Sequence, residues 1–251
     1  MDYQALAAAI TTWMREYLDR SGLQGFVVGL SGGIDSAVTA ALAVQAVGTG
    51  STHGILLPCH SQVEDARYAQ MLAEALDLDT QTIDLTTTCD ALTAVLPEGT
   101  KLAHANLRPR LRMTVLYYIA QIKRCLVAGT GNKPEMLVGY FTKYGDGGVD
   151  LEPLGALYKH EVRGLARVLG VPRPIIERPP TAGLWPGQTD EGELGITYDE
   201  LDALLAAMDG GTTPPVSEET AHRVRQMIAA SEHKRRLPPV FPVDRAALRG
   251  S

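Results

Sequence analysis

A short passage near the N-terminus, Gly25 to Ala37, constrains the fold more than any other part of the chain. It opens with a Val-rich apolar run, Phe26 to Leu30, which is too short for a helix and is typical of a buried strand. Ser31-Gly32-Gly33 interrupts this run, and a good helix former continues to Val47. The two glycines let the backbone come close to an anion, and the free N–H groups at the start of the new helix point at that anion. The passage therefore predicts a phosphate-binding turn on an α/β scaffold.

The side chains of this turn indicate the kind of phosphate site. Ser31 and Ser36 add hydroxyl donors, whereas Asp35 would repel a phosphate unless it holds a divalent cation that bridges to phosphate oxygens. The turn is neither a Walker loop nor a dinucleotide fingerprint, and an ordinary strand-to-helix turn is the alternative. The string S-G-G-x-D-S resembles the pyrophosphate loop of the ATP pyrophosphatase superfamily.

Composition narrows the class of protein. The 251 residues are enough for one large α/β domain. The net charge of -6 argues against sequence-independent binding of nucleic acid. Cys59, Cys89 and Cys125 form no C-x-x-C motif, so we expect buried free thiols in a reducing cytosol. Because no signal peptide or membrane-spanning run is visible, we expect a cytoplasmic protein without a membrane partner.

The rest of the chain alternates between strand and helix patterns. Buried strands are predicted at 52–57, 81–85 and 126–129, and helices at 3–20, 36–47, 61–76, 102–122, 154–169, 197–208 and from 217 to about 233. We predict a capping box between Ser61 and Glu64. This alternation predicts a parallel sheet with right-handed crossovers. Ligands bind at the carboxyl ends of such strands, so Ser31–Ser36 and Pro58–Gln62 are expected to line one crevice.

Three later segments are candidates for binding. Thr130 follows a strand, and Glu135 offers a carboxylate that could share a cation with Asp35, although an acid is favourable at any helix N-terminus. The Gly139–Asp150 segment has the composition of a binding loop or a surface turn. The long loop from 177 to 195 is a candidate lid that could close over a nucleotide, with Trp185 as one contact.

Two other features have ordinary alternatives. The 102–122 helix carries an apolar and aromatic stripe, including Tyr117 and Tyr118, that could face a partner subunit. Helix physics alone favours a core helix with a solvated basic face. The basic residues from 233 to 236 would be favourable at any helix C-terminus.

Together these segments resemble the NAD synthetase family, specifically the domain that amidates deamido-NAD. The matching strings occur in the family's order: Leu30–Val38, Arg110–Met113, Gly129–Glu135, Gly139–Asp146, Leu157–Lys159, Gln188–Tyr198 and His233–Arg235. The resemblance implies a doubly wound parallel sheet with helices on both faces, Rossmann-like and of the adenine nucleotide alpha hydrolase type. It also implies that the nicotinate carboxylate attacks the α-phosphate of ATP, and that ammonia then displaces AMP to give NAD.

The resemblance assigns roles residue by residue. Asp35 and Glu135 would bind Mg²⁺, and with Lys159 they would be the catalytic residues. The ATP contacts would be Gly29, Ser31, Gly32, Gly33, Asp35, Ser36, Thr130, Lys159 and Thr181. The deamido-NAD contacts would be Arg110, Lys143, Asp150, His233 and Lys234. No covalent nucleophile is needed, so catalysis would rest on positioning and electrostatic stabilisation.

The family's homodimer, with its dinucleotide site at the interface, reverses the preference on the 102–122 helix, which is then expected at that interface. Arg178 replaces a more usual Lys and could contact phosphate, and Pro134 fits the first turn of a helix. We expect one synthetase domain over 1–251 without a glutaminase domain, so ammonia is the expected nitrogen donor. The alternatives are another adenylating synthetase that forms amides, which the Lys143–Asp150 loop argues against, and a nucleotide-binding module without catalysis.

Overall fold

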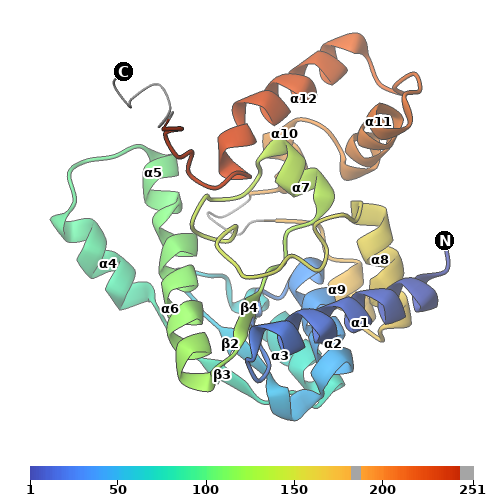
Figure 1. Ribbon diagram of the computed structural model, residues 1–251. Helices are drawn as coiled ribbons and strands as arrows, with labels where there is room; N and C mark the ends of the chain where they lie inside the picture. Colours follow the sequence, from blue (N-terminus) through green and yellow to red (C-terminus); the bar gives the residue numbers. More distant parts are fainter. Residues whose placement is uncertain (182–187, 244–251) are drawn as a thin grey trace, which may run out of the picture.

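The computed structural model describes residues 1–181 and 188–243 of the chain (Figure 1). The predicted lid contact Trp185 lies outside these residues. The elements, in order, are α1 (Tyr3–Ser21), β1 (Phe26–Gly29), α2 (Ile34–Val47), η1 (Thr49–Ser51), β2 (Thr52–Leu56), α3 (Val63–Leu76), β3 (Thr80–Thr82), α4 (Thr86–Val95), α5 (Lys101–Ala105), α6 (Leu107–Lys123), β4 (Leu126–Ala128), α7 (Lys133–Val138), α8 (Lys159–Val168), α9 (Arg173–Ile176), α10 (Asp190–Leu194), α11 (Tyr198–Gly210), α12 (Glu218–Ala230) and η2 (Glu232–Lys234).

A parallel sheet forms the centre of the described residues, with the strand order β3-β2-β1-β4. β1 lies between two partners, because Phe26 pairs with Thr52 of β2 and with Leu126 of β4. The carboxyl ends of the three strands therefore meet at one edge, and the loops that follow them converge there. The predicted parallel sheet is confirmed.

Alternate residues of β1 face opposite layers of helices, as the period of a strand requires. Phe26 and Val28 pack in a core that includes residues of α1, α2, α3 and α8. Val27 packs in a second core that includes residues of α4 and α6. Both faces of the sheet are covered, which confirms the doubly wound architecture (Figure 1).

The helix predicted at 102–122 is interrupted. α5 ends at Ala105 and α6 begins at Leu107, with Asn106 between them. Pro109 explains the break, because it lacks an N–H to donate to the preceding turn and is tolerated in the first turn of a new helix. On α6, the Tyr117 hydroxyl donates to Asp150 of the same chain, and Tyr118 is 68% exposed.

Several predicted boundaries also change. The capping box of α3 joins Gln62 to Asp65, rather than Ser61 to Glu64. The third strand ends at Thr82, and α4 follows it without having been predicted. α8, which bears Lys159, lies within the 154–169 segment in which a helix is predicted, and residues 153–156 before it form turns. α10 lies within the loop predicted at 177–195.

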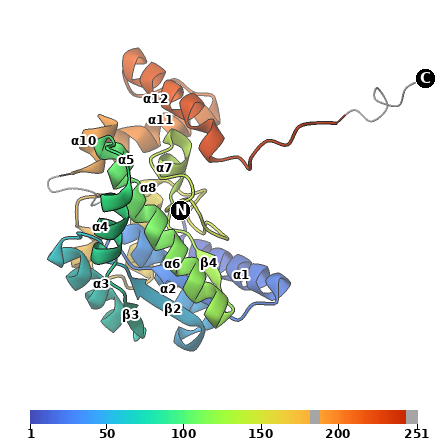
Figure 2. The same cartoon turned by 90° about the vertical axis from the view of Figure 1, so that its left-hand side faces the viewer.

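The last helices form a small core of their own at one end of the molecule (Figure 1). Tyr198, Leu201 and Leu204 are fully buried there, against residues of α7 and α12. Beyond η2 the described chain runs away from the body, and Leu237, Val240 and Phe241 are exposed on that segment (Figure 2). None of the helices in the described part is long and apolar enough to cross a membrane.

Candidate active site

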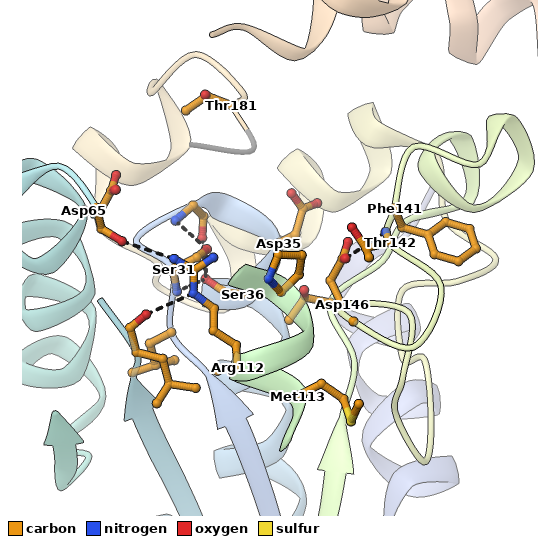
Figure 3. Close-up of a pocket in the computed structure, with 18 of the residues that line it drawn as sticks. Ser31, Asp35, Ser36, Asp65, Arg112, Met113, Phe141, Thr142, Asp146 and Thr181 are labelled. Carbon is orange, nitrogen blue, oxygen red and sulfur yellow. Dashed lines mark hydrogen bonds between the residues drawn. The ribbon is translucent and has the colours of Figure 1, made fainter. Parts of the chain in front are cut away.

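A cavity of about 690 Å³ opens where β1, β2 and β4 end (Figure 3). Its walls come from the Gly29–Ser36 turn, the Ser61–Gln62 loop, Thr130 and the Phe141–Asp146 segment. The predicted convergence of the loops after β1 and β2 is therefore confirmed. A volume of this size falls within the roughly 300–1,000 Å³ typical of small-molecule sites.

The turn after β1 has the backbone geometry of an anion cradle. Gly32 has φ +78°, and a Cβ built on it would lie 2.4 Å from the Asp65 carbonyl oxygen, so only glycine fits. The Ser36 hydroxyl donates to the Gly33 carbonyl at 2.9 Å and lies 3.1 Å from the Ser31 hydroxyl. Gly33 is the N-cap of α2 and has no side chain to cap the helix, so the first N–H groups of α2 are available to an anion.

A buried lysine lies between the two carboxylates predicted to bind a cation. Lys159 Nζ is 2.6 Å from Asp35 Oδ2 and 3.2 Å from Glu135 Oε1, and the lysine side chain is only 1% exposed. Asn132 Nδ2 donates to the other oxygen of Asp35 at 3.1 Å. Because α2, α7 and α8 each contribute one of the charged groups, folding assembles this cluster from distant parts of the chain.

Burial and charge act on these groups in opposite directions. Burial raises the pKa of Glu135 to about 7, and the Lys159 ammonium opposes this rise. Burial disfavours the charged form of Lys159, but Asp35 and Glu135 more than compensate, so its pKa lies above the ordinary value. The lysine is therefore charged at neutral pH and supplies the cation that two neighbouring carboxylates require.

The donor set suits a divalent cation. Carboxylate oxygens of Asp35 and Glu135 converge on one positive centre, which in this structure is the ammonium of Lys159. Mg²⁺ prefers hard oxygen ligands such as these. Mg²⁺ is commonly held by one or two carboxylates together with substrate phosphates. Both carboxylates border the cavity beside the glycine turn, so these residues fit the predicted ion.

The other predicted ATP contacts lie around the same cavity. Gly29, Thr130 and Thr181 line it, and the Thr181 hydroxyl donates to the Gln188 carbonyl at 2.8 Å. Arg178 also lines the cavity, where its guanidinium pairs with Asp65 at 2.5 Å and donates to the Gly32 carbonyl at 3.3 Å. In this structure it therefore supports the glycine turn.

The residues predicted to contact deamido-NAD are more dispersed. Arg110 is exposed and donates to the Lys143 carbonyl, and Lys143 Nζ donates to the His233 carbonyl at 2.6 Å. Lys234 lines the cavity and donates to the Gly139 and Phe141 carbonyls. Of these four residues, only Lys234 lines the cavity, and Arg110, Lys143 and His233 are linked to one another through backbone carbonyls. Asp150 differs, because both its oxygens already accept hydrogen bonds, from Tyr117 and from the Val127 N–H.

Several residues of the site were not predicted. Arg112 lines the cavity and donates to the Leu57 carbonyl at 2.9 Å and to Ser61 at 3.2 Å. Tyr198 touches Glu135, and Asp190 touches Tyr198. Arg112, Tyr198 and Asp190 each lie inside a string that resembles the family, and this is the one indication in the sequence that they belong to the site. Contacts between residues so far apart in the sequence have no local signal.

The fold and the site together define a class: an α/β nucleotide-binding enzyme with a glycine turn beside a buried Asp–Lys–Glu cluster. A family model described as NAD synthase matches residues 6–238. The NH(3)-dependent NAD(+) synthetase of Archaeoglobus fulgidus is 46% identical, over 97% of this chain and 98% of that protein. The chain belongs to the NAD synthase family.

Solved structures agree with this assignment. A structure described as NMN synthetase from Francisella tularensis has a TM-score of 0.89 at 36% identity, over 97% of this chain and 100% of that one. An NH3-dependent NAD synthetase from Campylobacter jejuni has a TM-score of 0.84 at 28% identity, over 96% of this chain and 100% of that one.

Proposed function

We propose that this chain is a ligase that amidates deamido-NAD to NAD, with ATP as co-substrate and ammonia as nitrogen donor. The single observation that carries the proposal is the Asp35–Lys159–Glu135 cluster beside the glycine turn, in a chain of this family. That geometry offers a cradle for the pyrophosphate end of ATP and a charged centre near its α-phosphate. A single synthetase domain over residues 1–251 is part of the same proposal.

The reaction divides into two displacements. An oxygen of the nicotinate carboxylate bonds to the α-phosphorus, and the bond to the pyrophosphate breaks. The ammonia nitrogen then bonds to the carboxyl carbon, the bond to AMP breaks, and a proton leaves the nitrogen. No step requires a covalent bond to the protein, so the residues bind, orient and neutralise charge.

Each part of the cavity has a task in this scheme. The turn from Gly29 to Ser36 holds the leaving pyrophosphate by backbone N–H groups and hydroxyls. Lys159 is the charged group that can neutralise the α-phosphate as the bond breaks, aided by Thr130 and Thr181 as ATP contacts. Asp35 and Glu135 would hold Mg²⁺, which would offset charge on the phosphates. The basic residues Arg110, Lys143, His233 and Lys234, together with Asp150, are the proposed contacts of deamido-NAD.

The test is direct. The purified chain is incubated with ATP, Mg²⁺, deamido-NAD and ammonium, and NAD and AMP are quantified, with Asp35→Ala alongside. Equal amounts of NAD and AMP, lost in the variant, are the expected result. Release of pyrophosphate only with a different carboxylate would keep the adenylation and reject the substrate. ATP binding without pyrophosphate release would indicate the non-catalytic alternative.

A second candidate is amidation of the mononucleotide, nicotinate mononucleotide. It is favoured by the similarity, over nearly the whole chain, to a structure described as NMN synthetase. The two substrates share the reacting carboxylate and differ in the AMP half. Comparing kcat/KM for the two acids separates the candidates, and a preference for the mononucleotide would overturn the first.

We also propose that two copies form a homodimer with the dinucleotide site at their interface. Exposed apolar side chains support this: Tyr118 and Ile122 of α6 are 68% and 63% exposed, and Phe241 is 81% exposed on the C-terminal segment. Their burial would stabilise self-association. Light scattering after size-exclusion chromatography tests it, and an active monomer would contradict it. The cytoplasmic location stays a prediction.

A further inference from the structure

A tyrosine hydroxyl lies between Glu135 and a second carboxylate. Tyr198 is fully buried, and its hydroxyl is 2.9 Å from Glu135 Oε1 and 3.1 Å from Asp190 Oδ2. A phenol has one proton, so it donates to one carboxylate oxygen at a time, and Glu135 is the nearer acceptor. The ring also lies beneath Lys159, whose Nζ is 4.6 Å from its centroid. Tyr198 thus contacts two members of the charged cluster.

The contacts continue beyond Asp190. Tyr140 lies between Asp190 Oδ1 at 3.1 Å and Glu193 Oε2 at 2.7 Å, and Gln188 donates to the same Glu193 oxygen at 2.8 Å. Two tyrosines and three carboxylates, Glu135 included, therefore form one hydrogen-bonded chain between α7 and α10. The far end of this chain of hydrogen bonds is Glu193 on the short helix α10.

This chain of hydrogen bonds also reaches the loop after α9, which carries the proposed ATP contact Thr181. The Asp190 N–H donates to the Pro180 carbonyl at 3.3 Å, and the Thr181 hydroxyl donates to the Gln188 carbonyl. Pro180–Thr181 and Gln188–Asp190 are therefore joined. The orientation of Glu135 and the place of Thr181 depend on the same set of contacts.

We propose that Tyr198 is a positioning residue for the reaction, whose hydroxyl donates to Glu135 and holds it facing Asp35, while Asp190 is the alternative acceptor on the loop side. The inference rests on the proposed function, because it gives Tyr198 the task of keeping the cation-binding pair in register. Groups that orient a metal ligand typically change metal affinity or activity by about 10–100-fold when removed. Tyr198 would therefore set the affinity of the carboxylate pair for a divalent cation.

The experiment measures cation binding directly. Mn²⁺ is titrated into the full chain in the presence of a non-hydrolysable ATP analogue, and free Mn²⁺ is followed by electron paramagnetic resonance. Tyr198→Phe keeps the ring under Lys159 and removes only the hydroxyl. We expect it to weaken Mn²⁺ binding about tenfold, or ~1.4 kcal/mol. The Mg²⁺ concentration for half-maximal rate should rise with it, while KM for deamido-NAD stays unchanged.

Two further variants complete the design. Tyr158→Phe removes a hydroxyl that contacts Lys133 and Asp209 outside the cavity, so Mn²⁺ binding should not change. Tyr140→Phe acts one step further along the chain and should weaken Mn²⁺ binding less than Tyr198→Phe does, because its hydroxyl does not touch Glu135. It also keeps the test open if Tyr198→Phe does not fold.

The outcomes separate the inference from the function on which it rests. If wild type and Asp35→Ala bind Mn²⁺ alike, the proposed cation site fails, whatever Tyr198 does. If wild type binds through Asp35 but Tyr198→Phe and Tyr140→Phe both bind as wild type does, the positioning role is overturned. A uniform loss of kcat with unchanged Mn²⁺ binding would overturn it as well.

Discussion

The glycine turn and the Asp35–Lys159–Glu135 cluster are held by contacts inside the chain, whereas two of the residues proposed to contact the dinucleotide lie on its surface and the other three are half-buried. Lys159 is 1% exposed between its carboxylates, and Gly32 has no room for a Cβ. Arg110 and His233, in contrast, are exposed. From this difference we expect that the proposed ATP half is formed by folding alone, and that the proposed dinucleotide half is completed by ligand or by a second subunit. Substitutions in the first half should therefore affect both stability and activity, and those in the second only activity.

The largest effect is expected from Lys159→Met. Removing the ammonium leaves two partly buried carboxylates without their cation, and breaking a buried ion pair typically costs about 3–5 kcal/mol. Loss of a charge that stabilises the transition state lowers kcat by about 10²–10³-fold. Urea unfolding and AMP formation measure the two effects, and saturating Mg²⁺ should recover part of the stability but not the rate.

Lys133→Met is the matched control for this prediction. Lys133 pairs with Asp209, whose side chain is 53% exposed, outside the cavity. A pair this exposed contributes about 0–1 kcal/mol, so little stability should be lost. Equal destabilisation by the two substitutions would show that the buried cluster is not specially dependent on its lysine.

The second-largest effect on activity is expected from Gly32→Ala. Alanine at φ +78° costs about 1–2 kcal/mol of stability. Its Cβ would also lie 2.4 Å from the Asp65 carbonyl oxygen, so one of the two must move. Because the turn must shift, KM for ATP should rise at least about tenfold, since a single lost tight contact is worth ~1.4 kcal/mol. Gly22→Ala separates the two causes: Gly22 has φ +69° with nothing within 4 Å, so it should lose stability without changing KM for ATP. A change in KM in both variants would contradict a local role for Gly32.

The two halves also differ in how far the sequence predicts them. The glycine turn and the parallel sheet follow from local patterns, because a strand, a turn and a helix are each encoded within a few residues. Contacts between distant residues are not encoded locally: Lys159 and Asp35 are 124 positions apart, and Tyr198 and Glu135 are 63 apart. The family resemblance placed Lys159 in the site but gave no role to Tyr198. The break at Asn106 was missed because helical periodicity continues across it, although Pro109 indicated it.

For the surface half, Arg110→Ala should raise KM for deamido-NAD by about tenfold, the worth of one charge-assisted contact. The guanidinium is exposed, so the free energy of unfolding should change by less than about 0.5 kcal/mol. Arg225→Ala, which removes an exposed arginine paired with Glu218, should leave KM unchanged. Equal KM values for Arg110→Ala and wild type would remove Arg110 from the dinucleotide site.

Glu152 lies behind the glycine-rich loop that follows β4. Glu152→Gln is expected to have the smallest effect on activity and a pH-dependent effect on stability. Burial raises the pKa of Glu152 to about 8, and the nearby charge of Asp146 raises it further, although the Gly131 N–H donates to its carboxylate at 3.1 Å. The folded state therefore holds a proton that the unfolded chain releases above its ordinary pKa of about 4.3. Stability falls as pH rises from that value to about 8, because the folded state binds more protons than the unfolded state over this range.

Glutamine keeps the shape and the acceptor for Gly131 but has no proton to lose. Glu152→Gln should therefore be more stable than wild type by a few kcal/mol at pH 8, and the difference should shrink toward zero near pH 4. Melting temperatures of both proteins across this range measure it. A stability difference that is independent of pH would mean that Glu152 is ionised in the folded protein over the whole range from pH 4 to pH 8. The buried site of Glu152 would then tolerate a charge as readily as the exposed dinucleotide half does.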